Sequence, residues 1–293
     1  MESSEIIRRV RRIEIKTRGL SANIFAGQYH SAFKGRGMAF SEVREYQFGD
    51  DVRDIDWNVT ARFHRPYVKV FEEERELTLM LLVDVSGSLD FATRGQLKRD
   101  MVAEIAATLA FSALQNNDKI GMVFFSDKIE KYIPPKKGRR HILYMIREML
   151  DFSPESKRTD ITQALEFLMQ VMKRRCTTFL LSDFFVSDSD VKSSVFQLAG
   201  RKHDMMAIQV YDQWATELPN VGLLKLVDAE SGEEMYVDTG SKRVRQQYRQ
   251  HWQNSQLRLN ETLNKSKIDH VSVSTDGDFV KALRTMFEMR IRK

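Results

Sequence analysis

The chain has 293 residues, a hydrophobic fraction of 42% and a formal net charge of +5, values that are ordinary for a globular protein and exclude a fibrous or low-complexity one. No apolar run is long enough to cross a bilayer, and the N-terminus lacks the charged and apolar regions of a signal peptide. The single cysteine, Cys176, excludes an internal disulfide and an all-cysteine metal site. We therefore expect a cytoplasmic protein in a reducing compartment.

Residues 5–20 form the first predicted element, a basic amphipathic helix. Its apolar residues recur at helical spacing, and five arginines and Lys16 supply much of the remaining surface. The apolar set is Ile6, Ile7, Val10 and Ile13. Such a helix can lie on an anionic membrane. The short stripe without tryptophan instead favours a helix that docks on its own domain and leaves its basic face in water.

The segment 31–76 differs in composition, because charges of both signs alternate with aromatic residues and neither helical nor strand periodicity persists. We expect an extended arm that is ordered by ion pairs and by Tyr46, Phe48 and Trp57 anchored in a groove. The arm ends in a predicted strand over 67–72.

Strands and helices alternate regularly from residue 77 onward. The predicted strands are near-continuous apolar runs, as in parallel sheets. They cover 77–83, 120–125, 177–182, 205–211 and 270–274. The predicted helices cover 95–115, 139–150, 161–174, 190–201, 243–264 and 278–289. Residues 222–238 alternate about Glu230-Ser231-Gly232 and predict an inserted β-hairpin.

This order of elements predicts an α/β fold with a doubly wound, mainly parallel sheet and helices on both faces. It also predicts two regions. Residues 1–76 form the N-terminal helix and arm, and residues 77–293 form the α/β domain with its hairpin.

Side chains with oxygen atoms occur in three predicted loops, which lie at the end of a strand or just before a helix. Asp84, Ser86 and Ser88 come directly after an apolar strand, Thr159 precedes a helix, and Asp183 ends the strand 177–182. Ligands of open α/β sheets bind at the carboxyl ends of the strands. Each loop alone is more typical of an ordinary turn or helix cap, with Thr159 or Asp160 as the cap. Their conjunction favours a Mg²⁺ site, with Mn²⁺ or Ca²⁺ as alternatives, because two carboxylates and three hydroxyls suit a hard cation.

The same five residues resemble the metal-ion-dependent adhesion site of von Willebrand factor A-type domains. From about Gly35 to the C-terminus the chain also resembles the bacterial family called domain of unknown function 58, the MoxR-associated proteins with such a domain. The matching stretches include 48–57, Gly138-Arg139-Arg140, Arg158-Thr159-Asp160, Leu181-Ser182-Asp183-Phe184, His203-Asp204 and Ser274-Thr275-Asp276.

The resemblance implies a von Willebrand factor A-like domain that works beside a MoxR-type AAA+ ATPase, in chaperone-like assembly or cofactor insertion. It further implies that the metal bridges this chain to an acidic residue of an unidentified client protein. We expect no catalysis, no nucleic-acid ligand and no transmembrane segment.

Other chemistry is less well supported by the sequence. A hydrolase of the haloacid dehalogenase type would use Asp84 as nucleophile, but Ser86 stands where that family has its second acid. No phosphate-binding Gly-x-x-x-x-Gly-Lys motif occurs, and the histidines lack the paired spacing of a zinc site. Basic clusters at 136–140 and 173–175 leave a nucleic-acid or membrane-surface adaptor as a further alternative, although they lack interleaved aromatics.

Overall fold

The computed structural model describes residues 8, 10–15, 39–72, 77–90, 93, 96–185, 193–229 and 232–291. The chain separates into two compact units, Phe33–Leu77 and a larger unit that joins Met1–Ala32 to Thr78–Lys293. The predicted N-terminal region 1–76 is therefore divided, because its first part groups with the sheet that follows it.

The smaller unit is built on a two-stranded antiparallel sheet of β1 (Ala39–Glu45) and β2 (Tyr67–Glu72). Between them lie the 3₁₀ helix η2 (Val52–Asp54) and the helix α3 (Trp57–Phe63). The predicted strand over 67–72 matches β2, whereas α3 lies in what was expected to be extended chain. The side chain of Asp56 caps α3 by accepting from the backbone N–H groups of Asn58 and Val59.

The aromatic anchors expected in this unit are not observed. Phe48 and Trp57 are exposed, Trp57 at 66%, and Tyr46 is half-buried. No residue of α3, Trp57 included, is buried. The expected ordering by ion pairs does hold, since Arg44 and Asp50 form a two-pronged pair at 2.7 and 2.8 Å.

The larger unit contains, among its described residues, a six-stranded sheet in the order β10-β7-β6-β3-β4-β5. All neighbouring strands are parallel except β4 and β5, which confirms the predicted mainly parallel α/β sheet. The strands are β3 (Thr78–Asp84), β4 (Lys119–Phe125), β5 (Ile129–Lys136), β6 (Thr177–Ser182), β7 (Asp204–Tyr211) and β10 (Asp269–Ser274).

Strand β5 was not predicted, because Pro134 and Pro135 interrupt its pattern. Proline cannot donate a ladder hydrogen bond and is therefore confined largely to edge strands. The edge position of β5 in this sheet is consistent with that rule.

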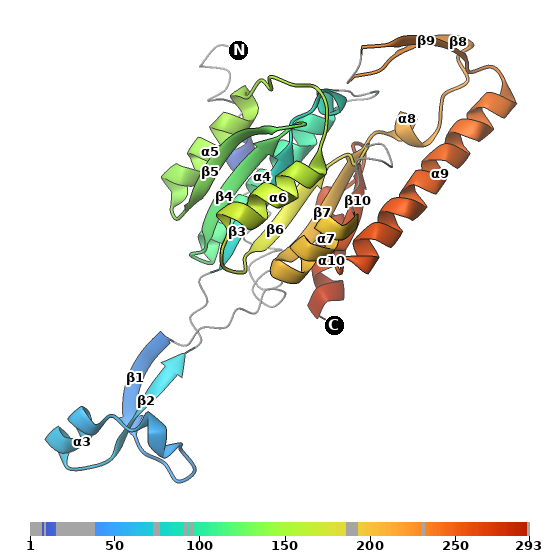
Figure 1. The fold of residues 1–293 in the computed structure, drawn as a ribbon. Coiled ribbons are helices and arrows are strands. Elements are labelled where there is room, and N and C mark those ends of the chain that lie inside the picture. Colours follow the sequence, from blue (N-terminus) through green and yellow to red (C-terminus); the bar gives the residue numbers. More distant parts are fainter. Residues whose placement is uncertain are drawn as a thin grey trace. The chain divides into compact units, whose positions relative to one another are not determined.

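Helices cover both faces of the sheet, as predicted (Figure 1). Leu82, Phe125 and Leu180 pack in one core cluster with residues of α6, α7 and α9. On the other face Phe179 packs edge-on against Phe287 of α10, and α4 packs on α5 and on the central strands. The helices are α4 (Lys98–Gln115), α5 (Arg139–Asp151), α6 (Ile161–Val171), α7 (Ser193–Lys202), α9 (Lys242–Lys265) and α10 (Phe279–Ile291).

The predicted hairpin is present as β8 (Leu223–Val227) paired with β9 (Glu234–Asp238), and it follows the short helix α8 (Gln213–Thr216). Figure 1 shows this hairpin beyond one end of the sheet. Within the part of the chain that the structure describes, no helix is both long and apolar enough to cross a membrane.

Candidate metal centre

The topology creates a switch point beside the central strand β3. From β3 the chain passes to β4 and β5 on one side, and it then returns to β6, β7 and β10 on the other. The crevice at the carboxyl ends of β3 and β6 is therefore the place where an open α/β sheet binds ligands. Asp84 is the last residue of β3, and Asp183 directly follows β6.

The loop after β3 turns sharply and gathers its polar groups inward. The backbone N–H of Ser86 donates to Asp84 Oδ1 at 2.9 Å, and the hydroxyls of Ser86 and Ser88 lie 3.0 Å apart. A short 3₁₀ turn, η3 (Gly87–Asp90), follows. Asp84, Ser86 and Ser88 are all buried, so their oxygens face the protein interior and the crevice instead of open water.

The loop after β6 brings the second carboxylate near enough to Asp84 for its charge to raise the pKa of Asp84. Ser182, at the end of β6, donates its hydroxyl to Asp84 Oδ2 at 2.6 Å. Phe184 has a positive φ of 54°, a conformation that is costly for a bulky residue and bends the chain just after Asp183. Asp183 is buried, its Oδ1 accepts from Phe185 N–H at 3.1 Å, and its backbone carbonyl accepts from Gln209.

Thr159 lies in the loop before α6, and two backbone hydrogen bonds hold that loop against the strand ends. Gly87 N–H donates to Lys157 O at 3.0 Å, and Asp160 N–H donates to Ser126 O at 2.9 Å. Asp160 is the N-cap of α6, with its carboxylate accepting from Gln163 N–H. The capping role thus belongs to Asp160, and Thr159 is buried beside the loop that carries Ser86 and Ser88.

The electrostatics of the crevice reflect two buried acids. Burial, and then the negative charge of Asp183, raise the pKa of Asp84 to about 7, against the hydrogen bonds from Ser182 and Ser86. A cation between the two carboxylates would offset both the burial and the repulsion.

Lys98 is a residue of the candidate site that the sequence did not predict. Its Nζ donates to Asp183 Oδ2 at 2.8 Å, and the side chains of Lys98 and Asp183 are only 9% and 3% exposed. The available signal was a lysine in the first turn of the helix after the Asp-x-Ser-x-Ser loop, where the helix dipole disfavours a cation.

The donor set fits a hard divalent cation. Oxygen ligands from Asp84, Ser86, Ser88, Thr159 and Asp183 match the preference of Mg²⁺, which also retains water. Among the described residues no group of three or more His, Cys, Asp or Glu side chains could hold a metal. The candidate site differs from such groups because hydroxyls supply most of its oxygens.

Two other clusters have different properties. Cys176 Sγ lies 3.3 Å from His203 Nδ1, but both residues are buried, and burial raises the pKa of the thiol to about 11. A neutral buried thiol is a poor nucleophile, so Cys176 acts here as a packing residue.

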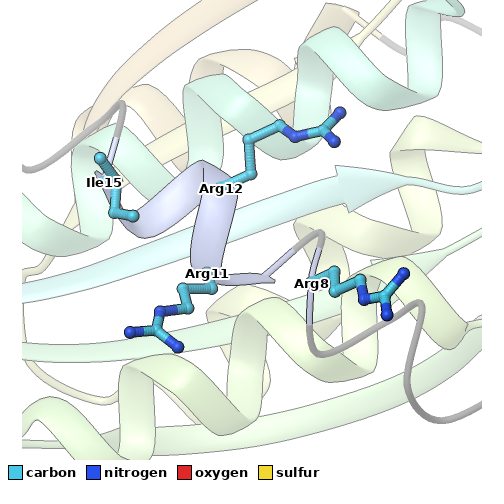
Figure 2. A pocket seen from close by; sticks show the side chains of 4 residues that line it. All are labelled: Arg8, Arg11, Arg12 and Ile15. Atoms are coloured by element: carbon cyan, nitrogen blue, oxygen red, sulfur yellow. The ribbon is translucent and has the colours of Figure 1, made fainter.

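The second cluster is a pocket of about 430 Å³ lined by Arg8, Arg11, Arg12 and Ile15. In Figure 2 the side chain of Arg11 points away from those of Arg8 and Arg12, so the guanidinium groups do not converge on one ligand. Ile13 on the same helical turn is buried, as expected for a helix docked on its own domain. Ile6 and Ile7 lie outside the described residues.

Comparison with known proteins gives a family match over most of the chain. The family described as "Protein of unknown function DUF58" matches residues 42–258. An uncharacterized protein of Mycobacterium tuberculosis is 32% identical over 225 residues, which are 76% of this chain and 70% of that protein. The uncharacterized protein YeaD of Bacillus subtilis is 28% identical over 131 residues, 45% of this chain and 29% of that protein.

Among solved structures, the conserved hypothetical protein BatB from Bacteroides thetaiotaomicron aligns with a TM-score of 0.49 and 13% identity, over 74% of this chain and all (100%) of that one.

Proposed function

We propose that this chain, which belongs to the DUF58 family, is a non-enzymatic protein-binding module whose ligand contact depends on Mg²⁺. The observation that carries the proposal is the pair of buried carboxylates, Asp84 and Asp183, at the switch point of the sheet with serine hydroxyls beside them. Buried carboxylates are retained when they are paired or coordinate a metal.

Each candidate ligand has a distinct role in this proposal. Asp84 and Asp183 would supply the negative charge, and Ser86, Ser88 and Thr159 would supply neutral oxygens. Bound there, Mg²⁺ supplies an open coordination position that takes a carboxylate oxygen. The acidic side chain would come from a client protein, and the neutral hydroxyls would add no further negative charge that repels it.

The proposed companion is a MoxR-type AAA+ ATPase, with a joint role in chaperone-like assembly or cofactor insertion in the cytoplasm. The resemblance of the sequence to MoxR-associated proteins supports this partner. The absence of a phosphate-binding motif in the chain also supports it, because the energy for remodelling a client would then come from another protein.

The deciding experiment is the dependence of thermal stability on Mg²⁺. With Mg²⁺ at about a hundred times its dissociation constant, the wild-type protein is expected to gain about 2.7 kcal/mol of stability over the same protein in EDTA. Asp84→Ala is expected to lose this gain. Asp276→Asn, which removes a carboxylate at an exposed position, is the control and keeps it. A wild-type melting temperature that is the same in Mg²⁺ and EDTA would refute the metal site.

A second experiment addresses the partner. Calorimetric titration of the purified companion ATPase into wild-type protein and into Asp84→Ala, in one Mg²⁺-containing buffer, isolates the contribution of this site. Binding by the wild type alone supports the proposal, whereas equal binding by both proteins contradicts a role of the metal in that contact.

The alternative of a phosphomonoester hydrolase is tested separately with wild type and Asp84→Asn. We expect no turnover by either protein. Both oxygens of Asp84 already accept hydrogen bonds, from Ser86 N–H and from Ser182 Oγ. Turnover by the wild type that Asp84→Asn abolishes would overturn the non-enzymatic assignment.

A further inference from the structure

A buried lysine forms an ion pair with one of the carboxylates that would bind the proposed metal. Lys98 Nζ lies 2.8 Å from Asp183 Oδ2, a length typical of a charge-assisted hydrogen bond. Lysine is rarely buried unless it is paired, and the pairing partner of Lys98 is a candidate metal ligand.

The position of Lys98 on its helix is also unfavourable for a purely structural cation. It is in the first turn of the 18-residue helix α4, where the N–H groups and the helix dipole favour negative charge. The N-cap residue of this helix, Leu97, makes no side-chain capping hydrogen bond. The favourable interaction of Lys98 is therefore with the acids of the crevice, and it outweighs the local cost of its place on the helix.

We propose that the ammonium group of Lys98 is a built-in cation of this site, which a divalent metal must displace from Asp183 before the site can fill. The proposal rests on the proposed Mg²⁺-binding function and concerns the control of that function. With both carboxylates ionised, Asp84, Asp183 and Lys98 carry a formal charge of −1. Adding a divalent ion without moving Lys98 would make a buried site positive, and burial of uncompensated charge is unfavourable.

The geometry of Asp183 supports competition for the same atom. Its Oδ1 accepts from Phe185 N–H, and its Oδ2 accepts from Lys98. The backbone carbonyl of Asp183 is held by Gln209, so the carboxylate is fixed in place, whereas the lysine side chain has a flexible four-carbon stem. The lysine is thus the group that moves when a metal takes Oδ2.

Lys98 then sets the metal affinity of the site. A site with two carboxylates and no internal cation would hold Mg²⁺ tightly at all times. The tethered ammonium weakens that affinity and makes loading depend on the free Mg²⁺ concentration or on an arriving carboxylate. It also halves the formal charge of the two carboxylates, from −2 to −1, when the metal is absent.

Calorimetric Mg²⁺ titrations of wild type and Lys98→Met test the inference. The variant is expected to bind Mg²⁺ at least about tenfold more tightly, equal to about 1.4 kcal/mol. Lys98→Arg keeps the charge, and its Mg²⁺ affinity is expected to stay within about threefold of the wild-type affinity. A threefold change is a smaller free energy than that of one charge-assisted hydrogen bond. Lys128→Met is the matched control, since Lys128 is a half-exposed lysine that pairs with Glu155 outside the site.

The outcomes separate this inference from the proposed function. Equal or weaker Mg²⁺ binding by Lys98→Met, with normal binding by the wild type, overturns the inference and leaves the metal site standing. Failure of both proteins to bind Mg²⁺ refutes the metal site, and with it the inference. Binding by Lys98→Met alone supports the competition and shows that Lys98 excludes the metal from the native protein.

A measurement on the wild type covers the case in which Lys98→Met does not fold. The ¹⁵Nζ resonance of Lys98 is followed by NMR during a titration with MgCl₂. A shift that saturates with Mg²⁺ binding is expected, because the hydrogen bond to Asp183 is lost. A resonance that stays in place while the site fills with Mg²⁺ contradicts displacement.

Discussion

Lowering the pH from 7.5 to 5 is expected to destabilise the folded protein through one buried histidine, His203. This side chain has no exposed surface. Its Nδ1 accepts from the backbone N–H of Cys176, so the proton of the neutral ring is on Nε2, which has no partner among the described residues. A second proton would have to enter at Nδ1 and break the existing hydrogen bond.

The pKa of His203 gives the direction and size of the effect. Burial, and then the charges of Lys202 and Arg175, lower this pKa from 6.5 to about 4. The unfolded chain therefore binds a proton as the pH falls through 6.5, while the folded protein does not bind it until about pH 4. Stability is lost across that window, by about 2 kcal/mol at pH 5 for these two pKa values.

The assay is urea unfolding of wild type and His203→Asn at pH 7.5 and pH 5. The asparagine oxygen can still accept from Cys176 N–H, but it does not titrate. Carboxylates add their own pH dependence to both proteins, so the informative quantity is the difference in unfolding free energy between them. That difference is expected to shrink by about 2 kcal/mol between pH 7.5 and pH 5.

The same substitution at His251, which is exposed on α9, is the control. Its difference from wild type is expected to stay constant, because water surrounds that side chain in both states. A constant difference for His203→Asn would refute the reasoning, since it would mean that the buried ring is protonated as readily as in the unfolded chain.

Two further substitutions test how the sheet and the site loop are held. Arg290 pairs with Asp204 at 2.6 Å and with Asp269 at 2.8 Å, so Arg290→Lys, which cannot span both, is expected to lower the unfolding free energy by about 2 kcal/mol; an unchanged urea midpoint contradicts this. A Cβ at Gly87 would lie 2.7 Å from the backbone oxygen of Ala229, so Gly87→Ala is expected to cost about 1–3 kcal/mol and to lower the melting temperature measured by calorimetry. An unchanged melting temperature would contradict this prediction, because it would mean that the β8–β9 hairpin moves away from the new Cβ without cost.

Much of the α/β unit was predictable because its elements carry strong local signals. The strand 177–182 was predicted with the bounds of β6, since a short segment of β-branched and large apolar residues is typical of a buried strand. Strand β5 was not predicted because its two prolines interrupt the pattern of strand-forming residues. Only the tertiary structure shows that β5 lies at an edge of the sheet, where proline is tolerated.

The smaller unit was less predictable for a related reason. Helix α3 has no buried face, so the hydrophobic periodicity that identifies most helices is absent. Its local signal was Asp56 as the N-cap. The sequence suggested that aromatic side chains such as Trp57 are buried. An aromatic side chain is buried, however, only where other residues of the fold pack against it.

The candidate ligands were predictable because the topology dictates where strand ends meet. Asp84 ends β3 and Asp183 directly follows β6. These strands are neighbours in the sheet, and a parallel sheet brings the carboxyl ends of its strands to one edge. The residues next to Asp84 and Asp183 in the sequence do not reveal which positive group compensates the charges of the two carboxylates. That information lies in Lys98, which is 85 residues from Asp183 in the chain and belongs to no part of the Asp-x-Ser-x-Ser pattern.

A set of metal ligands therefore does not by itself determine the behaviour of a metal site. Two buried carboxylates repel each other, and the fold must supply a positive charge or accept a protonated acid. Here an ammonium group already meets one of them at 2.8 Å. The same five oxygen donors would bind a divalent ion tightly without Lys98 and conditionally with it. If the site binds Mg²⁺ as proposed, the residue at position 98 would decide whether the metal is a permanent part of the protein or a signal to which the protein responds.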